Sequence, residues 1–334
     1  MNNNFYPSPI IISESEARHR VSVGIEDEIG MLSQFSLRKR LFGLSVFILF
    51  WALGIMLTCT AMKTAQGISH YTFWVSGALL SAVAINAFVL HLHEGMHGTL
   101  FWSPFWNRWC SVILGSTALI SFTAYKVLHL RHHRYLGDTR DPDDYHNYTK
   151  RNPLVWMMHY GRLLLGSSLY IFLIPIFAIR HGTRMDRRRI VEEYAVLFIL
   201  LGAAFLLFSL KFLLFAWLIP LLIVGFMTNL RGLTQHGVTN PQDAFLASRS
   251  IQANPVVAFC LLHENFHLEH HLFPEVPSYH LAALHRLIWE RIPRVVTGTS
   301  YSGFLARFVR ASIRMDDSPI GLNVRSGHGA ETSQ

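Results

Sequence analysis

Two long stretches of this chain contain no charged residue, and they restrict its fold more than any other feature. Leu41 to Met62 and Tyr71 to Leu92 are each long enough to cross the hydrocarbon core of a bilayer as an α-helix. A third stretch, Ala195 to Leu230, contains Lys211 as its one charged residue and is too long for a single untilted span. We therefore expect four transmembrane helices in two hairpins, with Lys211 near the turn of the second.

The composition agrees with a membrane environment. Charged residues make up 15% of the chain and hydrophobic residues 51%, whereas an average soluble domain is roughly 25% charged. One long buried helix in a large soluble protein is the alternative, but it does not explain so complete an absence of charge. Cys59, Cys110 and Cys260 have neither a disulfide-framework spacing nor a metal-site spacing, and we interpret them as small packing residues.

Two further apolar segments fit this pattern less well. Cys110 to Tyr125 is short, and Leu163 to Ile179 is interrupted by Pro175. We expect both to be membrane-surface or re-entrant helices. The predicted fold class is therefore all-α and integral to the membrane, with four transmembrane helices, surface helices and a cytoplasmic histidine-rich cap.

Three regions are expected along the chain. Residues 1–37 should form a cytoplasmic N-terminal segment, and residues 38–295 one membrane-embedded domain without internal repeats. Residues 296–334 should form a C-terminal segment that is largely disordered after about residue 315, where Ser, Gly and charge dominate. The N-terminal segment lacks the features of a secretory signal, so we expect the first apolar stretch to remain in the membrane.

The basic residues predict which side of the membrane each region occupies. Arg38, Lys39 and Arg40 directly precede the first apolar stretch, and basic residues are biased to the cytoplasmic side. Both termini and every histidine cluster are then cytoplasmic. The sequence favours a bacterial inner membrane and leaves an endoplasmic reticulum or plastid membrane open. The formal charge of +8 is spread around the apolar stretches, which favours lipid headgroups or an acidic protein over nucleic acid.

Three dense histidine clusters adjoin the apolar stretches, and their spacing is more informative than the total of 19 histidines. His93 and His97 are four residues apart, so both imidazoles share one helical face. Two triplets have the spacing i, i+3 and i+4, which converges in the same way: His129, His132 and His133, and then His267, His270 and His271. Eight imidazoles exceed the four ligands of a structural zinc site and suit two transition metals. His236 is a candidate for a ninth ligand.

Polar residues near these clusters are candidates for orienting the ligands, because a ligand histidine usually has its second ring nitrogen held by an acceptor. They are Glu94, Asp138, Asp141, Asp143, Asp144 and Glu269. His263, four residues before His267, is a candidate either for this role or for replacing a ligand. Taken singly, each carboxylate is as well explained as a solvated surface group. The spacing does not select the metal.

In these residues the chain resembles the membrane fatty acid desaturase superfamily, which also includes alkane hydroxylases and carotenoid hydroxylases and ketolases. The three histidine boxes occur in order within roughly residues 40–295. The run from Glu269 to Pro274 is similar to the third box of acyl-lipid desaturases, and the stretch from His132 to Asp143 is similar to carotenoid hydroxylases. The resemblance implies that the nine histidines named above bind two iron ions, with His236 in the most variable segment.

The resemblance implies an oxidoreductase that uses O2 as co-substrate. Desaturation of a fatty acyl chain taken from the membrane is the leading hypothesis, and hydroxylation or ketolation of a lipid or carotenoid is the near alternative. A zinc-binding membrane transporter or hydrolase is a remote alternative, because a transporter places polar ligands along the middle of its spans. The sequence contains no iron–sulfur cysteine set and no nucleotide-binding loop, so we expect an external donor such as a ferredoxin or a small b-type cytochrome.

Overall fold

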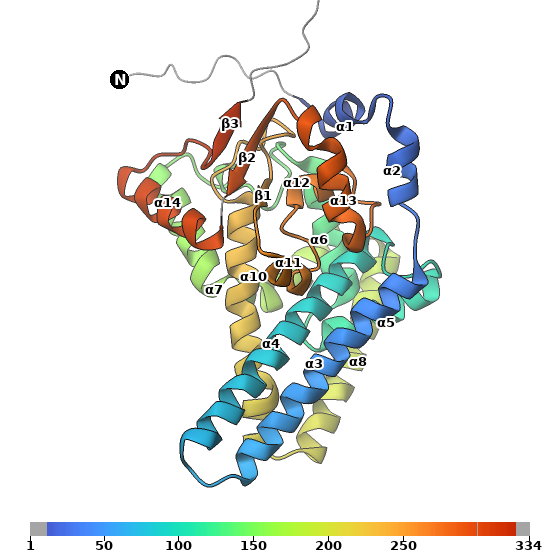
Figure 1. Cartoon of the computed structure of the whole chain (residues 1–334), viewed down its shortest axis with the longest axis vertical. Helices are drawn as coiled ribbons and strands as arrows, with labels where there is room; N and C mark the ends of the chain where they lie inside the picture. Colours follow the sequence, from blue (N-terminus) through green and yellow to red (C-terminus); the bar gives the residue numbers. More distant parts are fainter. Residues whose placement is uncertain (1–11, 299, 325–334) are drawn as a thin grey trace, which may run out of the picture.

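Helices account for most of the chain in the computed structural model, which describes residues 12–298 and 300–324. Long helices extend through the lower part of Figure 1, and shorter elements gather into a cap at its upper end. From α3 to α10 the elements are α3 (Leu37–Lys63), α4 (Ile68–His97), α5 (Pro104–Ser116), α6 (Phe122–Tyr135), η1 (Tyr145–Asn147), α7 (Asn152–His181), α8 (Arg184–Leu207), α9 (Leu210–Leu213), the π-helical turn η2 (Leu214–Leu218) and α10 (Ile219–His236). Before and after them are α1 (Glu14–Ser22), α2 (Glu26–Leu32), β1 (Arg249–Ile251), α11 (Pro255–Cys260), α12 (His267–Leu272), α13 (Ser278–Ile288), η3 (Trp289–Arg291), β2 (Arg294–Gly298), α14 (Tyr301–Arg314) and β3 (Leu322–Val324).

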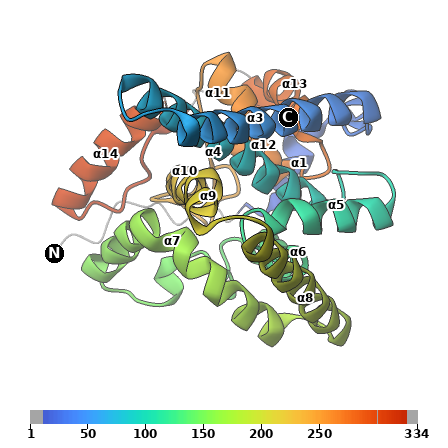
Figure 2. The same cartoon turned by 90° about the horizontal axis from the view of Figure 1, so that it is seen from below.

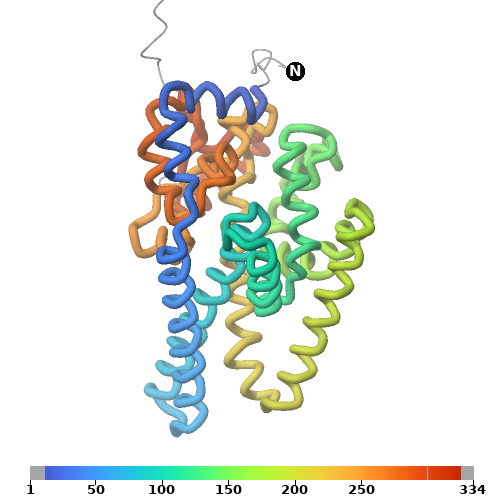
Figure 3. The backbone as a smooth tube through the Cα atoms, turned by 90° about the vertical axis from the view of Figure 1, so that its right-hand side faces the viewer, coloured from blue at the N-terminus to red at the C-terminus, as the bar shows by residue number. Residues whose placement is uncertain are grey.

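The first two uncharged stretches form a helical hairpin from α3 and α4, which lie side by side (Figure 1). Small residues bring the two backbones together. A Cβ atom added to Gly77 would lie 2.8 Å from the carbonyl oxygen of Gly54 and 2.8 Å from the hydroxyl oxygen of Thr58. Small residues of this kind allow membrane helices to approach closely. In Figure 3 the blue tube of α3 descends from the cap, and α4 returns to it.

The third apolar stretch forms α8 and a second helical segment that runs from α9 through η2 to α10. The chain leaves the helical conformation at Phe208. Ser209 then caps the next helix, because its hydroxyl accepts the backbone N–H of Phe212 at 3.2 Å. This break lies within three residues of Lys211, where the sequence predicts a turn.

Helix α7 contains the segment from Leu163 to Ile179, which the sequence predicts to be a membrane-surface or re-entrant helix. The whole segment lies inside one helix that continues through Pro175, and proline is tolerated in membrane helices where neighbouring groups satisfy the freed backbone carbonyl. Within the described residues, five helices are long and apolar enough to cross a membrane, where the sequence predicts four spans. In the view from below, α7 runs across the picture, whereas α10 is seen nearly end-on (Figure 2). Helix α7 is therefore inclined to the long axis of the molecule.

The other weakly apolar stretch, Cys110 to Tyr125, is divided between α5 and α6. The chain turns between the two helices at Leu119, which has a φ of 61°. The buried carboxylate of Glu193, on α8, accepts hydrogen bonds from the hydroxyls of Ser121 and Thr123 at 2.7 and 2.6 Å. These bonds anchor the start of α6, the helix that carries the second histidine cluster.

The cap is assembled from both ends of the described chain. Ala17 and Val21 of α1 are fully buried in a hydrophobic cluster with Leu268 and Leu272 of α12. Arg18 of α1 forms an ion pair with Glu275, which follows α12. The N-terminal segment therefore packs directly on the helix that carries the third histidine cluster.

A three-stranded sheet lies in the cap, and it corrects the prediction of an all-α chain. β1 pairs in parallel with β2, and β2 pairs antiparallel with β3. Strands of three to five residues are too short to show a period-two pattern in the sequence, and β1 is buried along its whole length. β3 lies in the segment that the sequence predicts to be largely disordered, and its pairing with β2 accounts for its order. Residues 325–334 of that segment lie outside the described residues.

Replacing Gly77 with Leu is expected to destabilise the protein, because the added side chain would collide with α3. Overpacking of this kind costs about 1–3 kcal/mol. The matched control is Gly202→Leu on α8, where no atom lies within 4 Å of an added Cβ. Both changes raise helix propensity equally, so their difference in melting temperature, measured in detergent, reports the packing. Equal melting temperatures would contradict a close contact at Gly77.

Candidate metal centre

The three histidine clusters converge at the cap end of the long helices. The first cluster is on α4, the second on α6 and the third on α12. The Nε2 atoms of His97 and His129 lie 2.8 Å apart. The rings of His133 and His271 are stacked with their centroids 4.2 Å apart. Side chains from all three clusters therefore face a shared space.

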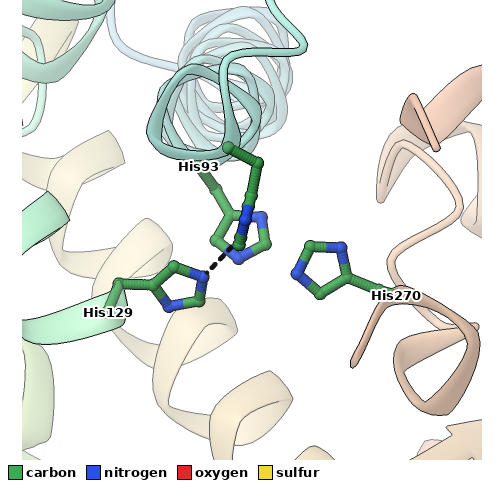
Figure 4. A group of neighbouring side chains, drawn as sticks. His93, His129 and His270 are labelled. Carbon is green, nitrogen blue, oxygen red and sulfur yellow. Dashed lines mark hydrogen bonds between the residues drawn. The ribbon is translucent and has the colours of Figure 1, made fainter. Parts of the chain in front are cut away.

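The described residues contain three groups of side chains whose ligand atoms all lie within 4.8 Å of one another. The groups are His93, His97, His129 and His270; then His132, His236 and His271; and then Glu14, His133 and His271. Figure 4 shows the imidazoles of His93, His129 and His270 directed toward one another from different parts of the chain. His267 lies beside the second group, with its Nε2 2.9 Å from that of His236. The structure thus brings all nine predicted histidines together.

Among the described residues, His93 has a buried Nδ1 without a hydrogen-bond partner, and four other imidazoles have a buried Nε2 without one. These four are His132, His133, His270 and His271. Leaving a buried polar atom unpaired costs about 1–3 kcal/mol, so a group of them in one place indicates a partner of another kind. A lone pair on an imidazole nitrogen is a good ligand for a transition metal. The side chains present therefore fit bound metal ions.

Burial keeps most of these imidazoles neutral. It lowers the pKa of five histidines outside the long helices well below the usual 6.5, and the neighbouring histidines add to the effect; they are His129, His133, His267, His270 and His271. Neutral imidazole is the form that binds a metal. His132 differs, because the effect of burial on its pKa is outweighed by Asp141 and Asp143, which raise that pKa.

Acceptors hold the second ring nitrogen of several histidines. Nδ1 of His132 donates to the carboxylate of Asp141 at 2.9 Å. Nδ1 of His236 donates to the carbonyl oxygen of Ala247 at 3.3 Å. Such contacts fix the ring orientation and leave Nε2 facing the shared space.

Two glutamates that the sequence analysis does not propose also lie beside Nδ1 atoms of the candidate ligands. The two carboxylate oxygens of Glu264 lie 3.3 Å from Nδ1 of His93 and 3.3 Å from Nδ1 of His267, and burial raises the pKa of Glu264. Glu14, on α1, lies 3.2 Å from Nδ1 of His271, and burial raises its pKa to about 7. Glu264 could have been found from its spacing of three residues before His267. Glu14 has no such signal, because 257 residues separate it from His271.

The two glutamates that the sequence analysis does propose have other contacts. Glu94 forms a buried ion pair with Arg40 and accepts the backbone N–H of Ser278 at 2.8 Å. Glu269 accepts from Nδ1 of His285 at 2.5 Å. Both carboxylates therefore hold the cap together instead of orienting one of the nine histidines.

Of the remaining candidates for orienting a ligand, some lie beside the nine histidines and others have contacts elsewhere. Asp143 lies 3.9 Å from Nδ1 of His132, next to the contact made by Asp141. Asp138 pairs with Arg140, and Asp144 contacts His146. His263 lines a separate cavity. Asp141 is thus the predicted carboxylate that holds a candidate ligand directly.

A cavity of about 470 Å³ extends from the histidines between α4, α7 and α10. His93, His236 and His267 line its polar end, and Leu218 of η2 and Leu221 of α10 line it further from the histidines. Leu221 precedes His236 by roughly 22 Å along the helix axis. The cavity can therefore hold an extended apolar chain with one part beside the histidines.

The family model described as fatty acid desaturase matches residues 69–302, which is more than half of the chain. No curated protein matches the sequence. The matched residues include all three histidine clusters, His236 and Glu264, whereas Glu14 lies outside them.

Replacing Glu14 with Ala is expected to weaken metal binding by about tenfold or more, because His271 would lose the acceptor that orients it. The control is Glu16→Ala, which removes an exposed carboxylate from the same helix. The measurement is elemental analysis of the purified protein after dialysis against increasing chelator concentrations. Equal metal retention in the two variants would show that Glu14 does not hold His271 in its binding orientation.

Proposed function

The chain belongs to the fatty acid desaturase family, and from this premise we propose that it introduces a double bond into a fatty acyl chain in an O2-dependent reaction. The observation that carries the proposal is the cavity, which joins the histidine groups to an apolar passage between helices of membrane-spanning length. Histidines and charged side chains such as Arg162 and Arg231 line part of this cavity. Apolar residues of α7, η2 and α10 line the rest, which suits a hydrocarbon chain. Family membership and the five apolar helices fit an integral membrane oxidoreductase of the desaturase or hydroxylase type.

Two iron ions are the proposed cofactors. Their proposed ligands are His93, His97, His129, His132, His133, His236, His267, His270 and His271, supported by the convergence of these side chains and their unpaired nitrogens. Imidazole accepts either iron or zinc, and the family match favours iron. When bound, such a pair supplies the O2-dependent oxidation of an unactivated C–H bond.

The protein supplies orientation and excludes water. Asp141 and Glu264 hold the imidazoles of His132 and His267 through their Nδ1 atoms, and Glu264 also lies 3.3 Å from Nδ1 of His93. The walls of the cavity keep the acyl chain extended along α10 and shielded from water. The depth to which the chain enters decides which carbon lies beside the histidines.

The reaction balances with an external electron donor. Two C–H bonds on neighbouring carbons break and give up two electrons and two protons. The donor supplies two more electrons, and solvent supplies two more protons. One O2 accepts the four electrons and four protons and leaves as two water molecules. We propose a ferredoxin or a small b-type cytochrome as the donor, because both are commonly acidic and would suit the basic cytoplasmic surface.

The histidine cap is proposed to lie on the cytoplasmic side, with a bacterial inner membrane as the favoured location. Arg38 and Lys39 stand at the start of α3, at the same end of the long helices as the cap (Figure 3). Basic residues next to a span favour the cytoplasm.

Expression of the protein in a host that lacks the product tests the reaction. Lipids that have lost two mass units are expected with the unaltered protein, and none with His270→Ala, which removes a proposed ligand. His146→Ala is the control, because His146 contacts Asp144 and is outside the metal-binding groups. Products that have gained an oxygen atom would instead establish a hydroxylase. Zinc in place of iron in the purified, fully loaded protein would exclude the proposed cofactor.

A bulky residue at the far end of the cavity should change which chains are accepted. Leu221→Trp would shorten the space along α10, and a chain that no longer fits is expected to react about tenfold more slowly relative to shorter chains. Ile199→Trp is the control, because Ile199 is 70% exposed on α8 and does not line the cavity. The measurement is the chain-length distribution of the products. An unchanged distribution in Leu221→Trp would exclude this cavity as the acyl site.

A further inference from the structure

A second cavity, of about 670 Å³, lies beside α4 on the face away from the histidine groups. His91 lines this cavity, whereas His93 lines the acyl cavity, and residues two positions apart on a helix point in nearly opposite directions. The two cavities have no lining residue in common. The start of α3, the end of α11 and the start of α13 enclose the rest of it, and these elements lie close together in Figure 2.

Basic side chains dominate the polar part of this second cavity. Arg38 and Lys39 are exposed at its edge, and Arg40 is buried in its wall. None of the residues that line it is acidic. Glu94, which lies behind the wall, balances the charge of Arg40 through their ion pair. The charges of Arg38 and Lys39 have no such counter-ion among the described residues.

Three nitrogen atoms in the wall of the second cavity lack a hydrogen-bond partner among the described residues. They are Nε of Arg40, Nε2 of His91 and Nδ1 of His263. Arg40 and His91 are each 1% exposed, so bulk water does not satisfy them. His263 also has a φ of 59°, a left-handed conformation that costs a residue other than glycine about 1–2 kcal/mol. Unpaired donors beside uncompensated positive charge suit an anion with several acceptor oxygens.

The second cavity continues into an apolar surface. Phe42 lines the cavity and is 62% exposed, and Ile48 and Leu49 are 53% and 64% exposed further along α3. Because α3 is one of the helices long and apolar enough to cross a membrane, this surface would lie against lipid. The polar part of the cavity would then lie at the depth of the lipid headgroups.

We propose that the second cavity binds the phosphate-bearing headgroup of an anionic membrane phospholipid, whose acyl chains lie along the exposed apolar surface of α3. The basic side chains and unpaired nitrogens contact the phosphate, and Phe42 contacts the start of an acyl chain. A basic pocket at the cytoplasmic ends of membrane helices is a general means of holding anionic headgroups. A free phosphate ion would satisfy the same donors, but it would leave the apolar surface unused. This site is separate from the histidine groups and does not depend on the reaction proposed above.

Three probes separate the sources of the phosphate. They are dioleoylphosphatidylglycerol, dioleoylglycerol, which has the same acyl chains without phosphate, and glycerol 3-phosphate, which has the phosphate without acyl chains. Each is added to the delipidated full-length protein in detergent, and the molecules retained per chain are counted by native mass spectrometry. One tightly retained dioleoylphosphatidylglycerol is expected, with dioleoylglycerol and glycerol 3-phosphate retained much less. If dioleoylglycerol or glycerol 3-phosphate were retained as well as dioleoylphosphatidylglycerol, the proposal would be overturned.

Two variants locate the bound lipid. Arg38→Gln with Lys39→Gln removes two exposed charges from the edge of the cavity, and retention is expected to fall about tenfold or more. Gly43→Leu keeps every charge but fills the cavity, since an added Cβ meets only His91, at 3.9 Å and beyond. Its retention should fall as well. The control is Arg187→Gln with Arg189→Gln, which removes two exposed charges from the start of α8. Unchanged retention in the first two variants, or an equal loss in the control, would overturn the proposal.

Discussion

The central constraint on the cap is that it buries imidazoles whose Nε2 atoms have no hydrogen-bond partner among the described residues. Four helices, α4, α6, α10 and α12, bring the histidines into one region, and His132, His133, His270 and His271 each leave that atom unpaired. Without a ligand, such a region is a source of instability, because unpaired polar groups are costly in the interior. Bound metal ions would turn the same atoms into the strongest contacts in the cap. We infer that metal binding and the stability of the cap are coupled.

Helix α4 has a central position because its two faces serve different purposes. His93 and His97 on one face belong to the first metal-binding group, and His91 on another face lines the second cavity. Glu94 connects these regions, since it pairs with Arg40 of α3 and accepts the backbone N–H of Ser278 at the start of α13. The contacts of Glu94 thus hold the hairpin of α3 and α4 to the cap, between the histidine groups and the second cavity.

The N-terminal segment is part of the centre even though it precedes the residues that match the family. α1 buries Ala17 and Val21 against α12, and the same helix places Glu14 next to His271 and His133. The apolar contact orders the segment, and the carboxylate then reaches the cluster. Residues outside the shared family region would therefore influence how this chain holds the proposed metal ions.

The sequence by itself determined the long helices, the three histidine clusters and their placement at helix ends, because these features depend on local spacing and on the absence of charge over continuous stretches. It also identified Asp141, which is close in sequence to its partner. The tertiary structure decided the short sheet, the continuation of α7 through Pro175, and the roles of Glu14, Glu94 and Glu264. These features depend on contacts between residues far apart in the chain. Spacing along a sequence shows which side chains share a helical face, but only packing shows which faces meet.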